Sequence, residues 1–216
     1  FSSLQLAGTI SSTSNFSIST LLDVSGTFSA SVGTATFTSS SLLSGTANLY
    51  NVTINGTSLQ LTTSSVLGIA NAFTISAGTL NVTATLPNTV NFNGLVAQNI
   101  NAITYDNLIL SNGSIKTASG NITVNADFTL SAATTFVAGS YTHSILRHWV
   151  NNGTFSSSTG TVQFTGINNA NITGTTTFNI LTINKSSVNN TVSLLNNVTA
   201  ATVNMTEGKM LTGLNS

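Results

Sequence analysis

The stretch Gly26-Thr-Phe-Ser-Ala-Ser-Val-Gly-Thr-Ala-Thr-Phe37 returns 127 residues later as Gly153-Thr-Phe-Ser-Ser-Ser-Thr-Gly-Thr-Val-Gln-Phe164. The similarity extends on both sides, so that residues 1–89 resemble residues 128–216. A shorter third copy lies between them at 90–127, where residues 124–131 match residues 69–76. Such self-similarity is the signature of a repeat protein. We therefore expect one domain over residues 1–216, made of three internal repeats.

Within the repeats, apolar and polar residues alternate. Examples are Val52 with Ile54, Leu80 with Val82, Ile122 with Val124, Leu181 with Ile183, and Val203 with Met205. A period of two indicates strands with one buried face. The residues that favour strands and turns dominate the composition, with 38 Thr, 31 Ser and 28 Asn among 216 residues. The sequence predicts an all-β protein.

Two all-β architectures fit short alternating strands, a β-sandwich and a solenoid. A sandwich need not repeat internally, whereas a solenoid stacks similar rungs that cannot bury their apolar face alone. The repeats therefore favour a right-handed parallel β-helix, with a pilin-like β-sandwich as the alternative. With rungs of about 18–25 residues and strands about 4.8 Å apart, the stack would be roughly 50 Å long.

The run NNGTFSSSTGTVQFTG, followed by ITGTTTFNILTINKSS and NNVTAATVNM, carries a resemblance to a known class of repeats. It resembles the β-helix repeats of large adhesin-like surface proteins of bacteria and archaea. The resemblance implies a right-handed parallel β-helix and an extracellular, cell-surface location. It implies no particular ligand.

Charge is scarce, with four Lys or Arg and four Asp or Glu residues in the whole chain. Nucleic-acid binding needs clustered Lys and Arg, so this class of partner is excluded. No apolar run approaches the roughly 18 residues of a membrane-spanning helix, and we expect no membrane insertion. Neither a metal site nor a cofactor is predicted, and the chain has no cysteine.

An enzyme working with paired carboxylates needs two acids a few ångströms apart. The four acids are Asp23, Asp106, Asp127 and Glu207, and no two of them are neighbours in sequence. We expect no catalytic residue and no enzyme. The enzyme hypothesis, a carbohydrate-active enzyme on a β-helix, requires that two of these acids, or an acid and Arg147, meet in a groove.

Residues 141–149 form the one local concentration of functional side chains. If they make a strand, His143, Ile145 and Arg147 share one face and His148 lies on the other. The favoured interpretation is a surface rung with Trp149 packed on the core. The alternative is an interaction patch of Arg147, His148 and Trp149 that stacks on surface carbohydrate.

Eight asparagines in Asn-x-Ser/Thr sequons are accessible on the predicted fold and are candidates for N-linked glycans. The apolar middle residue of some sequons points inward while the asparagine points outward; others read as exposed turns. The competing interpretation is that outward asparagines form hydrogen-bonded ladders along the stack. The candidates are Asn51, Asn55, Asn81, Asn112, Asn121, Asn152, Asn171 and Asn197.

Neither 1–6 nor 205–214 reads as a polar cap, because both alternate as the interior does. We therefore expect the stack to continue, in copies of the chain or in further repeats placed end to end. The function expected from these features is a structural or adhesive element of an extracellular surface fibre. A donor-strand pilus subunit is a further alternative, with residues 1–10 as the donated strand.

Overall fold

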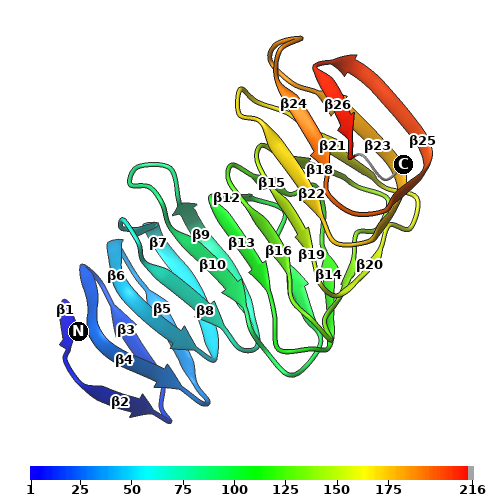
Figure 1. Cartoon of the computed structure of the whole chain (residues 1–216). Coiled ribbons are helices and arrows are strands. Elements are labelled where there is room, and N and C mark those ends of the chain that lie inside the picture. The colour runs from blue at the N-terminus through cyan, green and yellow to red at the C-terminus, as the bar shows by residue number, and fades with distance from the viewer. Residues whose placement is uncertain (214–216) are drawn as a thin grey trace. The chain divides into compact units, whose positions relative to one another are not determined.

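The computed structural model describes residues 1–213. Residues 214–216, which end the predicted copy 128–216, lie outside the described residues, and so does the last residue of the predicted uncapped end 205–214. The described part of the chain is all-β and contains no helix, and its parallel strands stack as a β-solenoid of about 11 turns. The chain divides into two compact units, Phe1–Gln98 and Asn99–Ser216. Figure 1 shows the strands of each unit lying side by side as successive rungs.

The first unit is built of ten strands, four of which are nine to eleven residues long. They are β1 (Ser3–Leu6), β2 (Thr9–Ser12), β3 (Phe16–Ile18), β4 (Leu21–Ala30), β5 (Thr34–Phe37), β6 (Ser40–Leu49), β7 (Asn51–Leu61), β8 (Val66–Ile69), β9 (Phe73–Asn81) and β10 (Thr89–Phe92). A further strand, β11 (Gln98–Ile100), lies at the division between the units.

The second unit is built mostly of short strands. They are β12 (Thr104–Tyr105), β13 (Asn107–Leu110), β14 (Ile115–Ala118), β15 (Thr123–Val124), β16 (Phe128–Leu130), β17 (Thr135–Val137), β18 (Thr142–Ile145), β19 (Trp149–Asn151), β20 (Thr154–Ser156), β21 (Thr161–Phe164), β22 (Ala170–Thr173), β23 (Thr176–Asn184), β24 (Thr191–Leu194), β25 (Val198–Glu207) and β26 (Lys209–Thr212).

From β12 to β22, successive strands of the second unit fall on three sheets in turn, which makes a rung three-sided. One sheet orders β13-β16-β19-β22-β24-β26, a second contains β14-β17-β20, and the third orders β12-β15-β18-β21-β23-β25. A complete rung is therefore β13, β14 and β15, and the next is β16, β17 and β18. The backbone hydrogen bonds run between rungs, as in any parallel sheet.

Every strand pair whose register is known within the described residues is parallel, including β5 with β7 and β8 with β10. Partner residues are from 17 positions apart, as in Thr34 with Asn51, to 23 apart, as in Val66 with Thr89. The parallel β-solenoid is thus confirmed, and the spacing is close to the expected rung length. A β-sandwich would pair antiparallel strands, so the sandwich alternative is wrong. The donor-strand hypothesis assumed a sandwich, and the observed fold gives it no support.

The core forms because the same position of each rung points inward. In the first unit Ile18, Phe37 and Ile54 are register partners on successive rungs, and each is 0% exposed. Fully burying such a side chain stabilises the fold by about 1.5–3 kcal/mol. In the second unit the rings of Phe128 and Trp149 stack with centroids 4.4 Å apart. Handedness and the three-copy division stay predictions from the sequence.

Glycine lets one long strand pass from one side of the rung to the next. Within β6, residues before Gly45 pair with β7 and residues after it pair with β8. Gly45 has φ of +78° and packs so closely on the rung below that a Cβ would lie 1.8 Å from the carbonyl oxygen of Val24. A left-handed φ and this close approach both require glycine.

We expect Gly45→Ala to destabilise the protein more than Gly8→Ala, which is its matched control. Gly8 has a similar φ of +84° but nothing within 4 Å of an added Cβ, so its substitution costs only the backbone term of about 1–2 kcal/mol. Gly45→Ala adds a collision with backbone to that term. Urea unfolding measures both free energies. Equal losses would contradict the close stacking of β4 and β6.

Candidate functional site

An ion pair holds the corner between β18 and β19. Arg147 donates from Nε to Oδ1 of Asp127 at 2.6 Å and from Nη2 to Oδ2 at 2.7 Å. The backbone N–H of His148 donates to the same Oδ1 at 3.2 Å. The hydrogen bond to Asp127 raises the pKa of the Arg147 guanidinium, so the guanidinium stays charged. The sequence did not identify this pairing, because its partners are 20 residues apart.

The corner is part of a polar ladder across successive rungs. Asn107 accepts from the backbone N–H of Asp127 at 3.3 Å and donates from Nδ2 to Asp106 at 3.2 Å. On the other side, Nδ1 of His148 accepts from the backbone N–H of Asn171 at 3.1 Å. The predicted patch residue His148 thus joins two rungs, and its role in the described contacts is structural.

Trp149 lies in the core and is 0% exposed. Its ring packs on Phe128, Phe155 and Phe178, and Nε1 donates to Oγ1 of Thr176 at 3.3 Å. The face of the indole is therefore covered by aromatic side chains from the neighbouring rungs. This corrects the alternative in which Trp149 stacks on a sugar, and leaves only Arg147 and His148 of that patch at the surface.

The segment 141–149, considered above as one strand, forms the shorter strand β18 (Thr142–Ile145), and β19 begins at Trp149. His143 and Ile145 share one face, as expected, and this face points inward, since the two residues are 2% and 1% exposed. Arg147 does not continue this face, because β18 ends at Ile145 and the chain turns outward to meet Asp127. Among residues 1–213 no group of three His, Cys, Asp or Glu side chains gathers in a way that could hold a metal ion.

The contact between Asp127 and Arg147 meets one requirement of the enzyme hypothesis, an acid beside Arg147. However, both carboxylate oxygens of Asp127 already accept hydrogen bonds from that arginine. Asp106 is 4% exposed, and Asp23 lies in β4 of the other unit. A catalytic carboxyl needs an oxygen within reach of its substrate, so this arrangement is suited to holding a corner.

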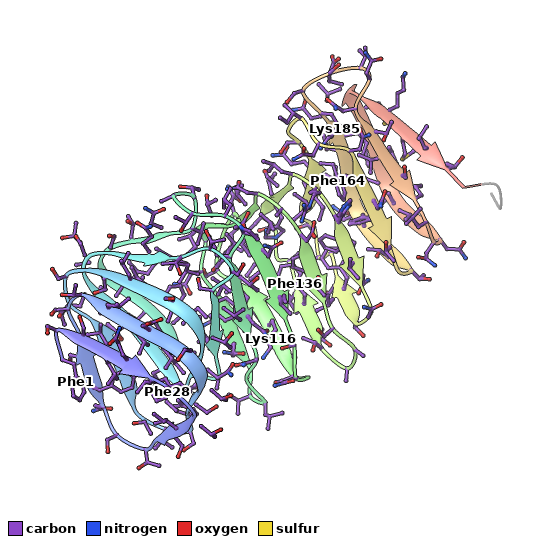
Figure 2. All side chains as sticks on the ribbon, turned by 60° about the vertical axis from the view of Figure 1, so that its left-hand side comes forward. Phe1, Phe28, Lys116, Phe136, Phe164 and Lys185 are labelled. Atoms are coloured by element: carbon purple, nitrogen blue, oxygen red, sulfur yellow. The ribbon has the colours of Figure 1, made fainter. Side chains whose placement is uncertain are left out.

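Two buried lysines were missed by the sequence analysis. Lys116 is 0% exposed and lies in register with Phe136, and Lys185 is 2% exposed. Figure 2 labels both lysines on the ribbon. Lys185 donates from Nζ to the carbonyl oxygen of Leu146 at 3.0 Å and to that of Thr165. Burial lowers the pKa of each ammonium group to about 8. The alternation of the strand could have indicated this burial, since Lys116 lies two residues before buried Ala118 and therefore on the same face of β14.

His143 is a neutral core residue. Its Nε2 lies 2.9 Å from the carbonyl oxygen of Ala138, which fixes the proton on that nitrogen. Its Nδ1 is buried and has no hydrogen-bond partner in the described part of the chain. Burial lowers the pKa of His143, because the imidazolium would lose its hydration.

Four of the five candidate sequons with an apolar middle residue have the geometry that alternation predicts, whereas Val198, which follows Asn197, is only half-buried. The apolar middle residues Val52, Val82, Ile122 and Ile172 are 0–2% exposed, while the preceding asparagines point outward. Five candidates are exposed and three are half-buried. The exposed ones are Asn55, Asn112, Asn121, Asn152 and Asn197, and the half-buried ones are Asn51, Asn81 and Asn171.

Some sequon asparagines are members of a ladder. Asn51 donates from Nδ2 to the carbonyl oxygen of Gly33 at 3.2 Å and accepts at Oδ1 from Nδ2 of Asn71 at 2.8 Å. Asn121 accepts from the backbone N–H of Thr142 at 3.0 Å. Asn81 instead makes a local contact, because its Oδ1 accepts from the backbone N–H of Thr83, two residues further along the chain, at 3.1 Å. The ladder interpretation therefore holds for Asn51 and Asn121, and glycosylation of the candidate asparagines stays a prediction.

Comparisons of this chain with models of protein families, with curated proteins and with solved structures found no match. The structure also contains no helix, within residues 1–213, of the length and apolar character needed to cross a bilayer.

We expect the free energy of unfolding to rise between pH 8 and pH 10. In this window Lys116 and Lys185 have released their protons in the folded protein but keep them in the unfolded chain. Each lysine therefore raises the free energy of unfolding by up to about 1.4 kcal/mol per pH unit. Lys185→Met should remove roughly half of the rise. The upper limit is pH 10 because burial raises the pKa of Tyr105, and an unfolded tyrosine ionises near 10.

Denaturant titrations at several pH values measure this slope. Lys209→Met, which removes an ammonium group from an exposed position, is the control for loss of one positive charge. A wild-type stability that falls from pH 8 to pH 10, or a slope that Lys185→Met leaves unchanged, would contradict the burial of these two lysines.

Proposed function

We propose that this chain is a structural or adhesive element of an extracellular surface fibre and performs no catalysis. In the proposed fibre, its rungs stack on further rungs, which copies of the chain or further repeats supply. The observation that carries the proposal is an open edge in the second unit, at β25 and β26.

The open edge exposes residues that are core residues everywhere else in the unit. Strand β25 pairs with β23 on one side and has no partner on the other among residues 1–213. Val203 and Met205 are in register with Leu181 and Ile183, which are 1% and 0% exposed. Val203 and Met205 are nevertheless 44% and 50% exposed. An unpaired strand edge beside apolar side chains is a template for another strand.

The outward faces support an adhesive role. On the first unit Ser17, Thr36, Thr53 and Thr74 are register partners on four successive rungs. Their hydroxyl groups form a row with a spacing of about 4.8 Å, and each hydroxyl both donates and accepts. Such a row offers uncharged hydrogen-bonding groups to a polyhydroxylated surface, which fits surface carbohydrate as the partner.

Self-association tests the proposal. Purified chain is expected to form filaments as its concentration rises, and Val203→Lys should prevent this by placing a charge on the inward-facing side of the open edge. Thr202→Lys is the matched control, because Thr202 is the adjacent exposed residue and points to the other face of β25. It should leave assembly intact.

Sedimentation velocity and negative-stain electron microscopy measure the outcome. Monomers of the wild-type chain at every concentration, or filaments of Val203→Lys equal to those of Thr202→Lys, would contradict the stacking of copies through β25.

The second candidate is a carbohydrate-active enzyme, because Asp127 and Arg147 are the one acid and arginine that the structure brings into contact among residues 1–213. We expect no release of reducing or unsaturated ends when the chain is incubated with a panel of acidic and neutral polysaccharides. Release that Asp127→Asn abolishes, and that Asp23→Asn leaves intact, would move the proposal to the enzyme class. Asp23 is a suitable control because it lies in β4 of the first unit and takes no part in this ion pair.

A further inference from the structure

Two pairs of adjacent asparagines, Asn151 with Asn152 and Asn196 with Asn197, lie at the same corner of the rung in the second unit. The register of Val150 with Thr173, extended by two residues, places Asn152 beside Thr175. The register of Ile172 with Leu194, extended by three, places Thr175 beside Asn197. The two pairs are therefore two rungs apart, a distance of about 10 Å.

The first asparagine of each pair holds the corner. Asn151 is 5% exposed and donates from Nδ2 to the carbonyl oxygen of Thr175 and to Oγ1 of Thr176, both at 3.1 Å. Its Oδ1 accepts from the backbone N–H of Gly153 at 3.1 Å. Asn196 accepts at Oδ1 from the backbone N–H of Gly174 at 2.8 Å. Neither residue begins a sequon.

The second asparagine of each pair begins a sequon and takes no part in holding the corner. Asn152 and Asn197 are exposed, and neither side chain has a hydrogen bond to residues 1–213. The hydroxyl residues of their sequons, Thr154 and Thr199, are exposed as well. Both carboxamides are thus accessible to an enzyme, and an attached sugar would displace no contact of the fold.

Asn51 shows the opposite arrangement in a sequon of the same kind. Its Nδ2, the atom to which a sugar would be attached, donates to the carbonyl oxygen of Gly33, and its Oδ1 accepts from Asn71. A sugar on this nitrogen would remove a donor and crowd a ladder between rungs. Breaking such a hydrogen bond destabilises the fold, and a polar group left without a partner destabilises it more when it is buried.

We propose that Asn152 and Asn197 are acceptor sites for N-linked glycans, arranged on alternate rungs along one corner of the solenoid. The inference rests on the proposed extracellular location, where glycans supply the hydration that the few charged residues do not. In the transfer, Nδ2 of each asparagine forms a bond to C1 of a sugar carried on a lipid diphosphate. The C1–O bond to the phosphate breaks, the lipid diphosphate leaves with the electron pair, and one amide proton passes to a base of the transferase.

The test is secretion of the chain from a host that performs N-glycosylation, followed by peptide mass spectrometry before and after treatment with a glycosidase. Glycan is expected on both Asn152 and Asn197 of the folded protein. Thr154→Ala should remove it from Asn152 without touching that asparagine, and Thr154→Ser, which keeps the sequon, should restore it. Enzymatic removal of the glycans should leave the melting temperature of the folded protein unchanged within a few degrees.

Secreted, folded chain with both asparagines unmodified would overturn the proposal. Glycan on Asn51 that is as complete as on Asn152 and leaves stability unchanged would also overturn it. The hydrogen bonds of Asn51 to the neighbouring rungs would then not prevent its glycosylation. These results do not depend on filament formation, so a failure of the glycan sites and a failure of the fibre proposal are distinguished by the two experiments.

Discussion

Parallel stacking of one rung on the next, in register and about 20 residues along the chain, is the constraint on which the rest of the structure depends. It directs backbone hydrogen bonds between rungs, so a single rung satisfies neither its backbone nor its apolar face. It also brings like positions together. Columns such as Ile18, Phe37 and Ile54 in the first unit follow directly from it.

The same constraint produces polar columns. Asn51 is hydrogen-bonded to the rungs on both sides of it, and Lys185 reaches the carbonyl oxygens of two rungs below its own. Hydrogen bonds between uncharged groups replace ion pairs on most of this surface, which explains how a chain with only 4% charged residues forms an ordered exterior. The stacking has no internal limit, and this physical property connects the fold to the proposed fibre.

Much of the fold was predictable because alternation is a local signal. Val52, Ile54, Ile122 and Val124 point inward as their period of two indicates. Val203 and Met205 follow the same pattern but stay half-exposed, because no rung covers them among residues 1–213. Burial in a solenoid depends on the next rung as well as on the residue itself.

The partners across rungs were not predictable, because insertions change the spacing between 17 and 23 residues. The ion pair of Arg147 with Asp127 and the carbonyl partners of Lys185 both required that spacing. Lys116 was missed for another reason, since a lysine is ordinarily a surface residue and only its parity with Ala118 indicates burial. Trp149 was ambiguous because nothing in its own segment specifies the aromatic rings of the adjacent rungs.

Disulfide formation between introduced cysteines tests the in-register stacking most directly, and the native chain has no cysteine to interfere. Thr36 and Thr53 are register partners on β5 and β7, so the Cα atoms lie about 4.8 Å apart, within the range of a disulfide. We predict that the variant with Thr36→Cys and Thr53→Cys oxidises rapidly to one intramolecular disulfide. The variant with Thr36→Cys and Asn55→Cys should form little disulfide, because its two Cα atoms lie about 8 Å apart. A disulfide that forms readily in the second variant and not in the first would contradict the parallel register.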